Sequence, residues 1–204
     1  MKIRITYTEE ALGTACANPE VHGEFIASKS ADKAKAKEEL EALDADVLLD
    51  KAITVFAKDG DGNPFWWDYQ IRGYIKEFLQ FKTEFSPFVV KVRGKDIKFS
   101  KWTYKRLVDN FIFVTPRKIR LNIPRDKEMG LCTRSLRATT MRGDRTALAT
   151  SETVPAGTTC EFEVHCLQKE LFEMLEECFD YGQFKGLSQW RNSGKGRFIW
   201  ELLE

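Results

Sequence analysis

The chain has 204 residues, of which 43% are hydrophobic and 31% charged, so it is long enough to bury a core and has an ordinary globular composition. A transmembrane helix is not indicated because no long apolar run is present, and the alternating first residues differ from the apolar block of a signal peptide. The five cysteines are widely spaced and form no CxxC pair, which argues against a zinc ribbon or a disulfide framework. We therefore expect a cytoplasmic protein with reduced thiols and no membrane partner.

The net charge of +1 hides an uneven distribution of charged residues. Residues 91–145 hold 16 basic and 5 acidic side chains, whereas the rest of the chain holds 16 basic and 26 acidic ones. A basic block in an otherwise acidic chain favours a polyanionic partner. The alternative is a solvated face whose charges are balanced by acidic residues that lie nearby in space.

The first part of the chain contains two predicted strands with an insertion between them. Residues 2–7 alternate between apolar and polar side chains, which is typical of a half-buried strand, and residues 53–57 form a second short strand. Residues 29–50 are rich in Ala, Lys and Glu, which predicts a surface helix inserted between the two strands.

A well-defined amphipathic helix is predicted after residue 68. Its buried stripe is formed by Ile71, Tyr74, Ile75, Phe78 and Leu79, which recur at helical spacing. Asp68 is placed as the N-cap. Gly73 lies inside this helix, where glycine costs about 1 kcal/mol relative to alanine, so we expect another backbone or a ligand to approach it closely.

The middle of the chain is predicted to consist mainly of hairpins. Residues 88–92 and 96–99 form one hairpin, and residues on either side of 142–145 form another. A short basic helix over 101–111 and strands at 112–114 and 117–123 lie between them. An alternating strand near 158–166 and an amphipathic helix over 168–181 then precede the last strand. The order of elements predicts an α+β, ferredoxin-like sheet with helices on one face, carrying insertions at 29–50 (helical) and 88–150 (hairpins), within a single domain over 1–204.

Four glycines, two lysines, two arginines and two tryptophans gather in the stretch from residue 182 to 200, GQFKGLSQWRNSGKGRFIW. Glycines let the backbone approach a ligand or adopt positive φ, and successive backbone N–H groups can surround an anion. Cations beside an aromatic ring suit phosphate contact and base stacking. The stretch therefore indicates a nucleic-acid-binding loop, with a long glycine-rich hairpin as the alternative.

Three stretches together resemble the repeat-associated mysterious protein (RAMP) superfamily of CRISPR systems. They are RITYTEEALGT after residue 3, DGDGNPFWWDYQIRGYIKEFL from residue 59 with its Arg-Gly pair, and residues 154–198 with the PAGT turn and WRNSGKGRF. The resemblance covers about 80 residues in the family's order. It implies an RRM-like core that binds the backbone of RNA. We expect this RNA to be single-stranded. It also implies contacts with CRISPR effector subunits and self-association along RNA.

On that basis the candidate RNA contacts are Arg72, Lys76, Lys185, Trp190, Arg191, Asn192, Lys195 and Arg197. The chain departs from the family where Gln189, Trp190 and Arg191 replace small residues, and Tyr69-Gln70 replaces a Ser-Ser pair. We find no counterpart of the cleavage aspartate that some backbone subunits carry, because the spacing of Asp50 does not fit.

The preferred hypothesis is therefore a non-catalytic RNA-binding protein, and two alternatives remain open. The chain also resembles short proteins of bacterial viruses and prophages, so one alternative is an anti-defence protein that mimics a subunit and inhibits a host complex. The other is a metal-independent ribonuclease, because guide-processing members of the family often use a histidine placed as His22 is. A histidine with a pKa near 6.5 suits activation of a 2′-hydroxyl group.

Metal binding and cofactor binding are not predicted. His165 and Cys166 point to opposite faces of a strand, so one ion does not readily take both. Asp59 and Asp61 are spaced as in a calcium loop, but the loop lacks the bidentate glutamate at its twelfth position.

Overall fold

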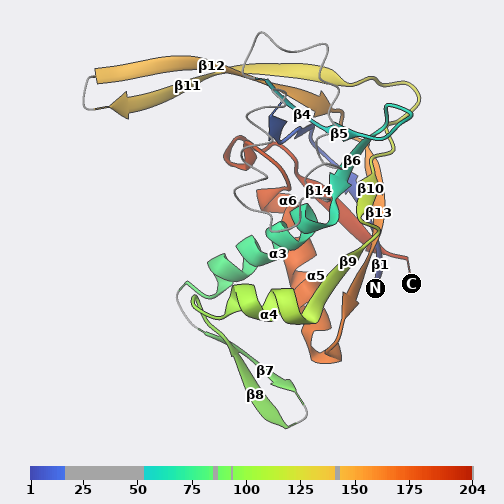
Figure 1. Cartoon of the computed structure of the whole chain (residues 1–204), viewed down its shortest axis with the longest axis vertical. Helices are drawn as coiled ribbons and strands as arrows, with labels where there is room; N and C mark the ends of the chain where they lie inside the picture. The colour runs from blue at the N-terminus through green and yellow to red at the C-terminus, as the bar shows by residue number, and fades with distance from the viewer. Residues whose placement is uncertain (17–52, 85–86, 93, 141–142, 204) are drawn as a thin grey trace.

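The computed structural model of the chain describes residues 1–16, 53–84, 87–92, 94–140 and 143–203 (Figure 1). Its central sheet has four strands in the order β14, β1, β13, β9, and every neighbouring pair is antiparallel. These strands span Phe198–Leu202, Lys2–Tyr7, Thr159–Cys166 and Ile112–Thr115 respectively. Helix α3 (Asp68–Lys82) lies between β1 and β9 in the chain, and α5 (Phe172–Asp180) lies between β13 and β14. This split βαβ arrangement confirms the predicted α+β, ferredoxin-like fold.

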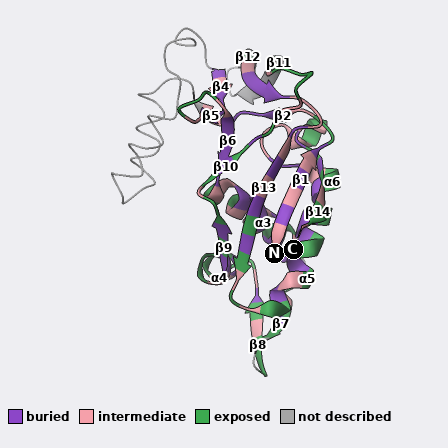
Figure 2. Ribbon diagram, turned by 90° about the vertical axis from the view of Figure 1, so that its right-hand side faces the viewer, coloured by how far each residue is buried: buried purple, intermediate pink, exposed green. Residues whose placement is uncertain are grey.

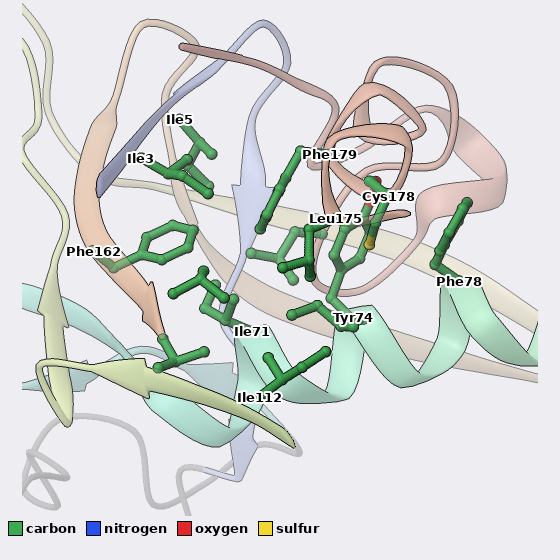
Figure 3. Close-up of a cluster of buried hydrophobic side chains, with 14 of the residues drawn as sticks. Ile3, Ile5, Ile71, Tyr74, Phe78, Ile112, Phe162, Leu175, Cys178 and Phe179 are labelled. Atoms are coloured by element: carbon green, nitrogen blue, oxygen red, sulfur yellow. Dashed lines mark hydrogen bonds between the residues drawn. The ribbon is translucent and has the colours of Figure 1, made fainter. Parts of the chain in front are cut away.

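Both helices cover the same face of the sheet, and the core lies between them (Figures 1 and 3). The alternation of β1 produces this face, because Ile3, Ile5 and Tyr7 are buried and the residues between them are not. Opposite the strands, the buried stripe of α3 is the one that the helical spacing predicts. The core side chains drawn and labelled in Figure 3 are Ile3, Ile5, Ile71, Tyr74, Phe78, Ile112, Phe162, Leu175, Cys178 and Phe179.

Helix α3 begins one residue earlier than the predicted cap implies. Trp67 is the N-cap, and its backbone N–H donates a hydrogen bond of 2.8 Å to the side-chain oxygen of Gln70. Asp68 is therefore the first helical residue and not the N-cap. Its carboxylate still lies in the first turn, where it is favoured by the positive end of the helix dipole.

The remaining elements are attached around this core. A three-stranded sheet has the order β10-β6-β5, and a second sheet has the order β11-β12-β4-β3, with β2 pairing to β12. The strands of the two sheets are β10 (Lys118–Arg120), β6 (Pro64–Trp67), β5 (Ala57–Lys58), β11 (Gly130–Thr140), β12 (Gly143–Val154), β4 (Ile53–Val55), β3 (Ala15–Cys16) and β2 (Ala11–Leu12). The other elements are β7 (Phe88–Val92), β8 (Lys95–Phe99), α4 (Tyr104–Phe111), α6 (Gly182–Lys185) and the short 3-10 helices η1 (Lys169–Leu171) and η2 (Arg191–Ser193).

The two predicted hairpins, β7–β8 and β11–β12, form and extend at opposite ends of the long axis (Figure 1). Thr140 pairs with Gly143, so the second turn comes slightly before the predicted 142–145. Strand β9 lies within the predicted 88–150 insertion but belongs to the central sheet.

The predicted helix at 29–50 lies outside the described residues. No helix in the described ranges combines the length and the apolar character that a membrane span requires.

The face of the central sheet that the helices leave open consists of partly exposed residues (Figure 2), most of which are polar or charged. Arg4 on β1 forms ion pairs of 2.7 Å with both Glu161 on β13 and Glu201 on β14. His165 lies on the same face, 2.8 Å from the hydroxyl of Thr115 on β9. Phe113 on β9 is an exposed aromatic residue of this face. An RRM stacks two or three bases on aromatic side chains of its sheet, so a face on which charged residues and ion pairs predominate differs in composition from such a platform.

A buried hydrogen bond joins β1 to β6 and provides a test of the core. The indole N–H of Trp66 donates to the hydroxyl of Tyr7 at 2.8 Å, and burial raises the pKa of Tyr7, so the phenol remains protonated. Tyr7→Phe leaves the indole N–H without an acceptor. The free energy of unfolding should therefore fall by about 1–3 kcal/mol in thermal or denaturant melts.

The matched experiment repeats Tyr7→Phe in a Trp66→Phe background, where no indole N–H is left without a partner. The loss should be clearly smaller there. Equal losses in the two backgrounds would show that this hydrogen bond is not what the substitution removes.

Candidate nucleic-acid interface

The glycine-rich stretch forms a loop, residues 186–197, which we call the C-terminal loop. Its backbone is fixed to the segment after β1, because the Gly196 N–H donates to the Glu10 carbonyl at 2.8 Å and the Thr8 N–H donates to the Arg197 carbonyl at 2.9 Å. The loop is also closed on itself by a 2.8 Å bond from the Leu187 N–H to the Gly196 carbonyl. The pairing of β1 with β14 thus positions the loop beside the start of the chain.

Close backbone approach accounts for three of the glycines. A Cβ atom at Gly186 would lie 2.6 Å from the Lys195 carbonyl, and one at Gly196 would overlap the Leu187 carbonyl. Both residues also have positive φ, at 76° and 70°. Gly182 packs against the ring of Phe198. At these positions the group that comes close is the protein itself, and the predicted approach of a polyanion to the loop stays a prediction.

A hollow of about 680 Å³, which we call the loop pocket, lies between the C-terminal loop and β11. It is lined by Ser135, Lys185, Ser188, Gln189, Trp190, Arg191, Asn192 and Ser193. None of these lining residues is acidic. Asn192 accepts a 3.0 Å hydrogen bond from the Lys185 ammonium group through its Oδ1 atom, which leaves its amide N–H donors available to a ligand. The pocket therefore offers positive charge and neutral hydrogen-bonding groups together.

Trp190 at this pocket is partly buried, and the guanidinium group of Arg134 stacks on its ring. Arg134 also donates a 3.4 Å hydrogen bond to Gln189, while its Nε and Nη1 atoms are buried without a partner among the described residues. Burial lowers the pKa of Arg134 to about 10, so the group keeps its charge at neutral pH. The cation covers part of the indole and leaves less of it open for a base than the sequence predicts.

Four of the predicted RNA contacts form ion pairs within the protein. Arg72 pairs with Asp68 at 3.1 Å and Lys76 with Asp109 at 2.5 Å. Arg191 pairs with Glu77 of α3, and Lys195 pairs with Glu10, which raises the pKa of Lys195. The Arg191 pair brings the C-terminal loop against α3.

Two of the predicted cations form no ion pair with any residue that the structure describes. Lys185 contacts Asn192, and the exposed Arg197 has no carboxylate partner within the described part of the chain. Glu177 on α5, the helix before this loop, pairs with Lys82 of α3. The charges of Lys185 and Arg197 are the ones most available to an anion.

A second hollow of about 700 Å³, which we call the helix groove, runs along α3 beside the loop pocket. It is lined by Gly73, Lys76, Glu77, Gln80, Phe81, Glu84, Tyr104, Lys105, Tyr181 and Lys185. Lys185 lines both hollows and so connects them. Gly73 is exposed, and a Cβ atom built on it would meet no heavy atom within 4 Å. The predicted crowding of Gly73 by another backbone is therefore wrong, because the space beside it is open.

The structure brings part of the predicted site together and adds residues to it. Lys76, Lys185, Trp190, Arg191 and Asn192 line the two hollows, whereas Arg72, Lys195 and Arg197 lie outside them. Sequence analysis missed the residues that α3, α4, β11 and the junction between α5 and α6 contribute, namely Phe81, Tyr104, Lys105, Arg134 and Tyr181. No local pattern marks these residues, because the tertiary fold brings them to the site.

The basic block of residues 91–145 is not one patch. Its members run from the β7–β8 hairpin through α4 and β10 to the β11–β12 hairpin, at the two ends of the molecule (Figure 1). Lys105 and Arg134 reach the candidate site from opposite sides. The basic side chains of this block are therefore spread over several elements around the site and do not form one binding surface.

Two further predictions concern catalysis and metal binding. His22 lies outside the described residues, so its role as a general base stays a prediction. Among the residues that the structure describes, no group of three His, Cys, Asp or Glu side chains is placed to hold a metal ion. Cys132, Cys160, Cys166 and Cys178 are free, and burial raises the pKa of Cys160 and Cys178.

Comparisons with known proteins relate the fold to CRISPR complexes. No protein-family model and no curated protein sequence matches the chain. A chain of the type III-B Cmr-beta structure, determined by cryo-EM with cognate target RNA bound, matches with a TM-score of 0.58 and 11% identity. The match covers 100% of this chain and 58% of that one, so this protein spans little more than half of its length. A chain of a type IV-B CRISPR complex matches over 98% of this chain and 88% of its own, at 11% identity and a TM-score of 0.45. The first match shows that the chain shares its fold with a component of a CRISPR effector complex.

The contrast between two glycines gives a test of the site's geometry. Gly73 is a helical glycine in open space, so Gly73→Ala should raise the free energy of unfolding by about 1 kcal/mol. Gly186 has positive φ and touches the Lys195 carbonyl, so Gly186→Ala should lower it by more than that gain. Urea titrations of the two variants measure both changes. A loss of stability for Gly73→Ala would show that the groove is closed at this point.

Proposed function

We propose that this protein is a non-catalytic, cytoplasmic RNA-binding protein of the RAMP type, related in role to the backbone subunits of CRISPR effector complexes. The bound RNA is single-stranded and lies over the C-terminal loop and the outer side of α3. CRISPR effector subunits and further copies of this chain along the RNA are the proposed protein partners. The fold shared with a chain of the RNA-bound Cmr-beta structure supports this proposal.

The observation that carries the proposal is the composition of the loop pocket. Lys185 lines it, Arg134 stacks on its tryptophan, and none of its lining residues is acidic. Arg191 also lines it, but its charge is paired with Glu77. Phosphate groups dominate the affinity of proteins for nucleic acid, and they bind where cations and N–H donors are not already occupied by carboxylates. The amide of Asn192 and the hydroxyls of Ser135 and Ser193 add donors that suit a sugar–phosphate backbone.

The internal ion pairs favour a second candidate, a protein that inhibits a defence complex by occupying it. Four predicted contacts already have carboxylate partners, namely Arg72, Lys76, Arg191 and Lys195. RNA phosphates must compete with these carboxylates for the cations. A protein surface that carries both charges can contact the ion pairs without breaking them. A viral or prophage origin would fit this candidate. RNA binding by the isolated chain discriminates between the two, because the inhibitor does not require it.

The proposed function predicts RNA binding that weakens with salt. For single-stranded RNA the logarithm of affinity should fall linearly with the logarithm of salt concentration, with a slope of about −0.7 for each phosphate contact. Lys185→Ala combined with Arg197→Ala should reduce this slope by roughly 1.4 in fluorescence anisotropy titrations. Lys195→Ala should reduce it less, because Glu10 already neutralises that charge.

The matched control removes two cations far from the site, by Lys2→Ala on the sheet and Lys169→Ala on η1. This variant should retain the wild-type slope. Binding that is flat between low and physiological salt, or an equal change of slope in the control, would contradict RNA binding at the C-terminal loop.

A further inference from the structure

We propose that the helix groove binds unpaired nucleobases of the RNA, with Phe81 and Tyr181 as the stacking surface. This inference rests on the proposed function and adds to it, since the loop pocket accounts for phosphates and the helix groove for bases. A groove that takes bases selects single-stranded RNA, because bases in a duplex are already stacked and paired.

The aromatic side chains of the groove support this assignment. The rings of Phe81 and Tyr181 are nearly parallel, at 10°, with centroids 5.4 Å apart. Phe81 is 55% exposed although it lies on a helix whose apolar stripe is otherwise buried. An exposed aromatic ring that packs against a second, nearly parallel ring offers a π-face on which a base can stack. Stacking of this kind does not depend on the identity of the base.

The open space beside Gly73 gives a base room to enter. Apart from the neighbouring backbone of α3, no heavy atom lies within 4 Å of a Cβ atom built at this position, so the space beside the glycine is open. Tyr104 lines the same groove, and its hydroxyl is engaged with Gln80 at 3.1 Å. Glycine leaves this part of the helix surface open, at a cost of about 1 kcal/mol in helix stability relative to alanine.

The lysines that line the groove suit the phosphates of an RNA backbone that continues past it. Lys105 and Lys185 line it without carboxylate partners in the described ranges, and Lys185 also lines the loop pocket. Of the two acidic lining residues, Glu77 is neutralised by Arg191, and Glu84 also lines a separate hollow with Pro87 and with Lys98 of β8. A base in the groove thus has cations on both sides for its neighbouring phosphates.

The test compares an intact RNA oligonucleotide with one of equal length and charge in which every nucleotide is abasic. Anisotropy titrations are made with the wild-type chain, with Phe81→Ala, and with Phe184→Ala as the matched control. Phe184 is also exposed, at 73%, but it does not line the groove. Phe81→Ala should weaken the intact oligonucleotide roughly five- to hundredfold and leave the abasic one unchanged, while Phe184→Ala should change neither.

Equal affinity of the wild-type chain for the two oligonucleotides would overturn the base-binding groove and leave RNA binding at the loop pocket intact. It would also be the result if the groove instead accepts a side chain of a protein partner. Equal losses for Phe81→Ala and Phe184→Ala would overturn the inference as well. No binding of either oligonucleotide by the wild-type chain would overturn the proposed function itself.

A second variant fills the groove without removing an aromatic ring. Gly73→Leu places an apolar side chain in the open space, and leucine is a better helix former than glycine, so the protein should remain folded. Binding of the intact oligonucleotide should fall at least fivefold while Gly73→Ala retains most of it. A Leu variant that binds intact RNA as the wild type does would show that no base lies beside Gly73.

Discussion

The position of β1 between β13 and β14 determines the rest of the structure. Because β1 is antiparallel to both neighbours, the segment that follows it and the loop that precedes β14 leave the sheet at the same end. Hydrogen bonds from Thr8 and Gly196 then join these two segments. The same strand supplies Ile3, Ile5 and Tyr7 to the core against which α3 packs. One strand pairing therefore places the C-terminal loop, α3 and the hollows between them.

The charges of the site have two different roles. Arg191 and Lys195 pair with Glu77 and Glu10, and these ion pairs hold the C-terminal loop against α3 and the segment after β1. Such partly exposed pairs add little stability, but they fix the orientation of the loop before any ligand binds. Lys185, Arg197 and the stacked Arg134 are not neutralised by carboxylates in the described residues. Affinity for an anion is therefore expected to come from a few cations on a preorganised surface.

Sequence periodicity predicted the elements well and predicted their contacts poorly. The alternation of residues 2–7 and the stripe of α3 identified buried faces, because burial follows the period of strand or helix. Gly73 and Gly186 look alike in sequence, yet one lies in open space and the other touches a carbonyl nine residues away. Likewise the stacking of Phe81 on Tyr181 and of Arg134 on Trp190 joins residues far apart in the chain. Such contacts depend on the tertiary fold and leave no local pattern.

The central claim is that RNA lies along α3 and the C-terminal loop and not on the open face of the sheet. Photocrosslinking with a single-stranded RNA that carries 4-thiouridine, followed by mass spectrometry of the crosslinked peptides, tests it most directly. The account predicts crosslinks in peptides that contain Phe81, Tyr181 and Trp190. Crosslinks confined to β1, β9 and β13, for example at Phe113 or His165, would contradict it, because those residues lie on the face of the central sheet that the helices leave open.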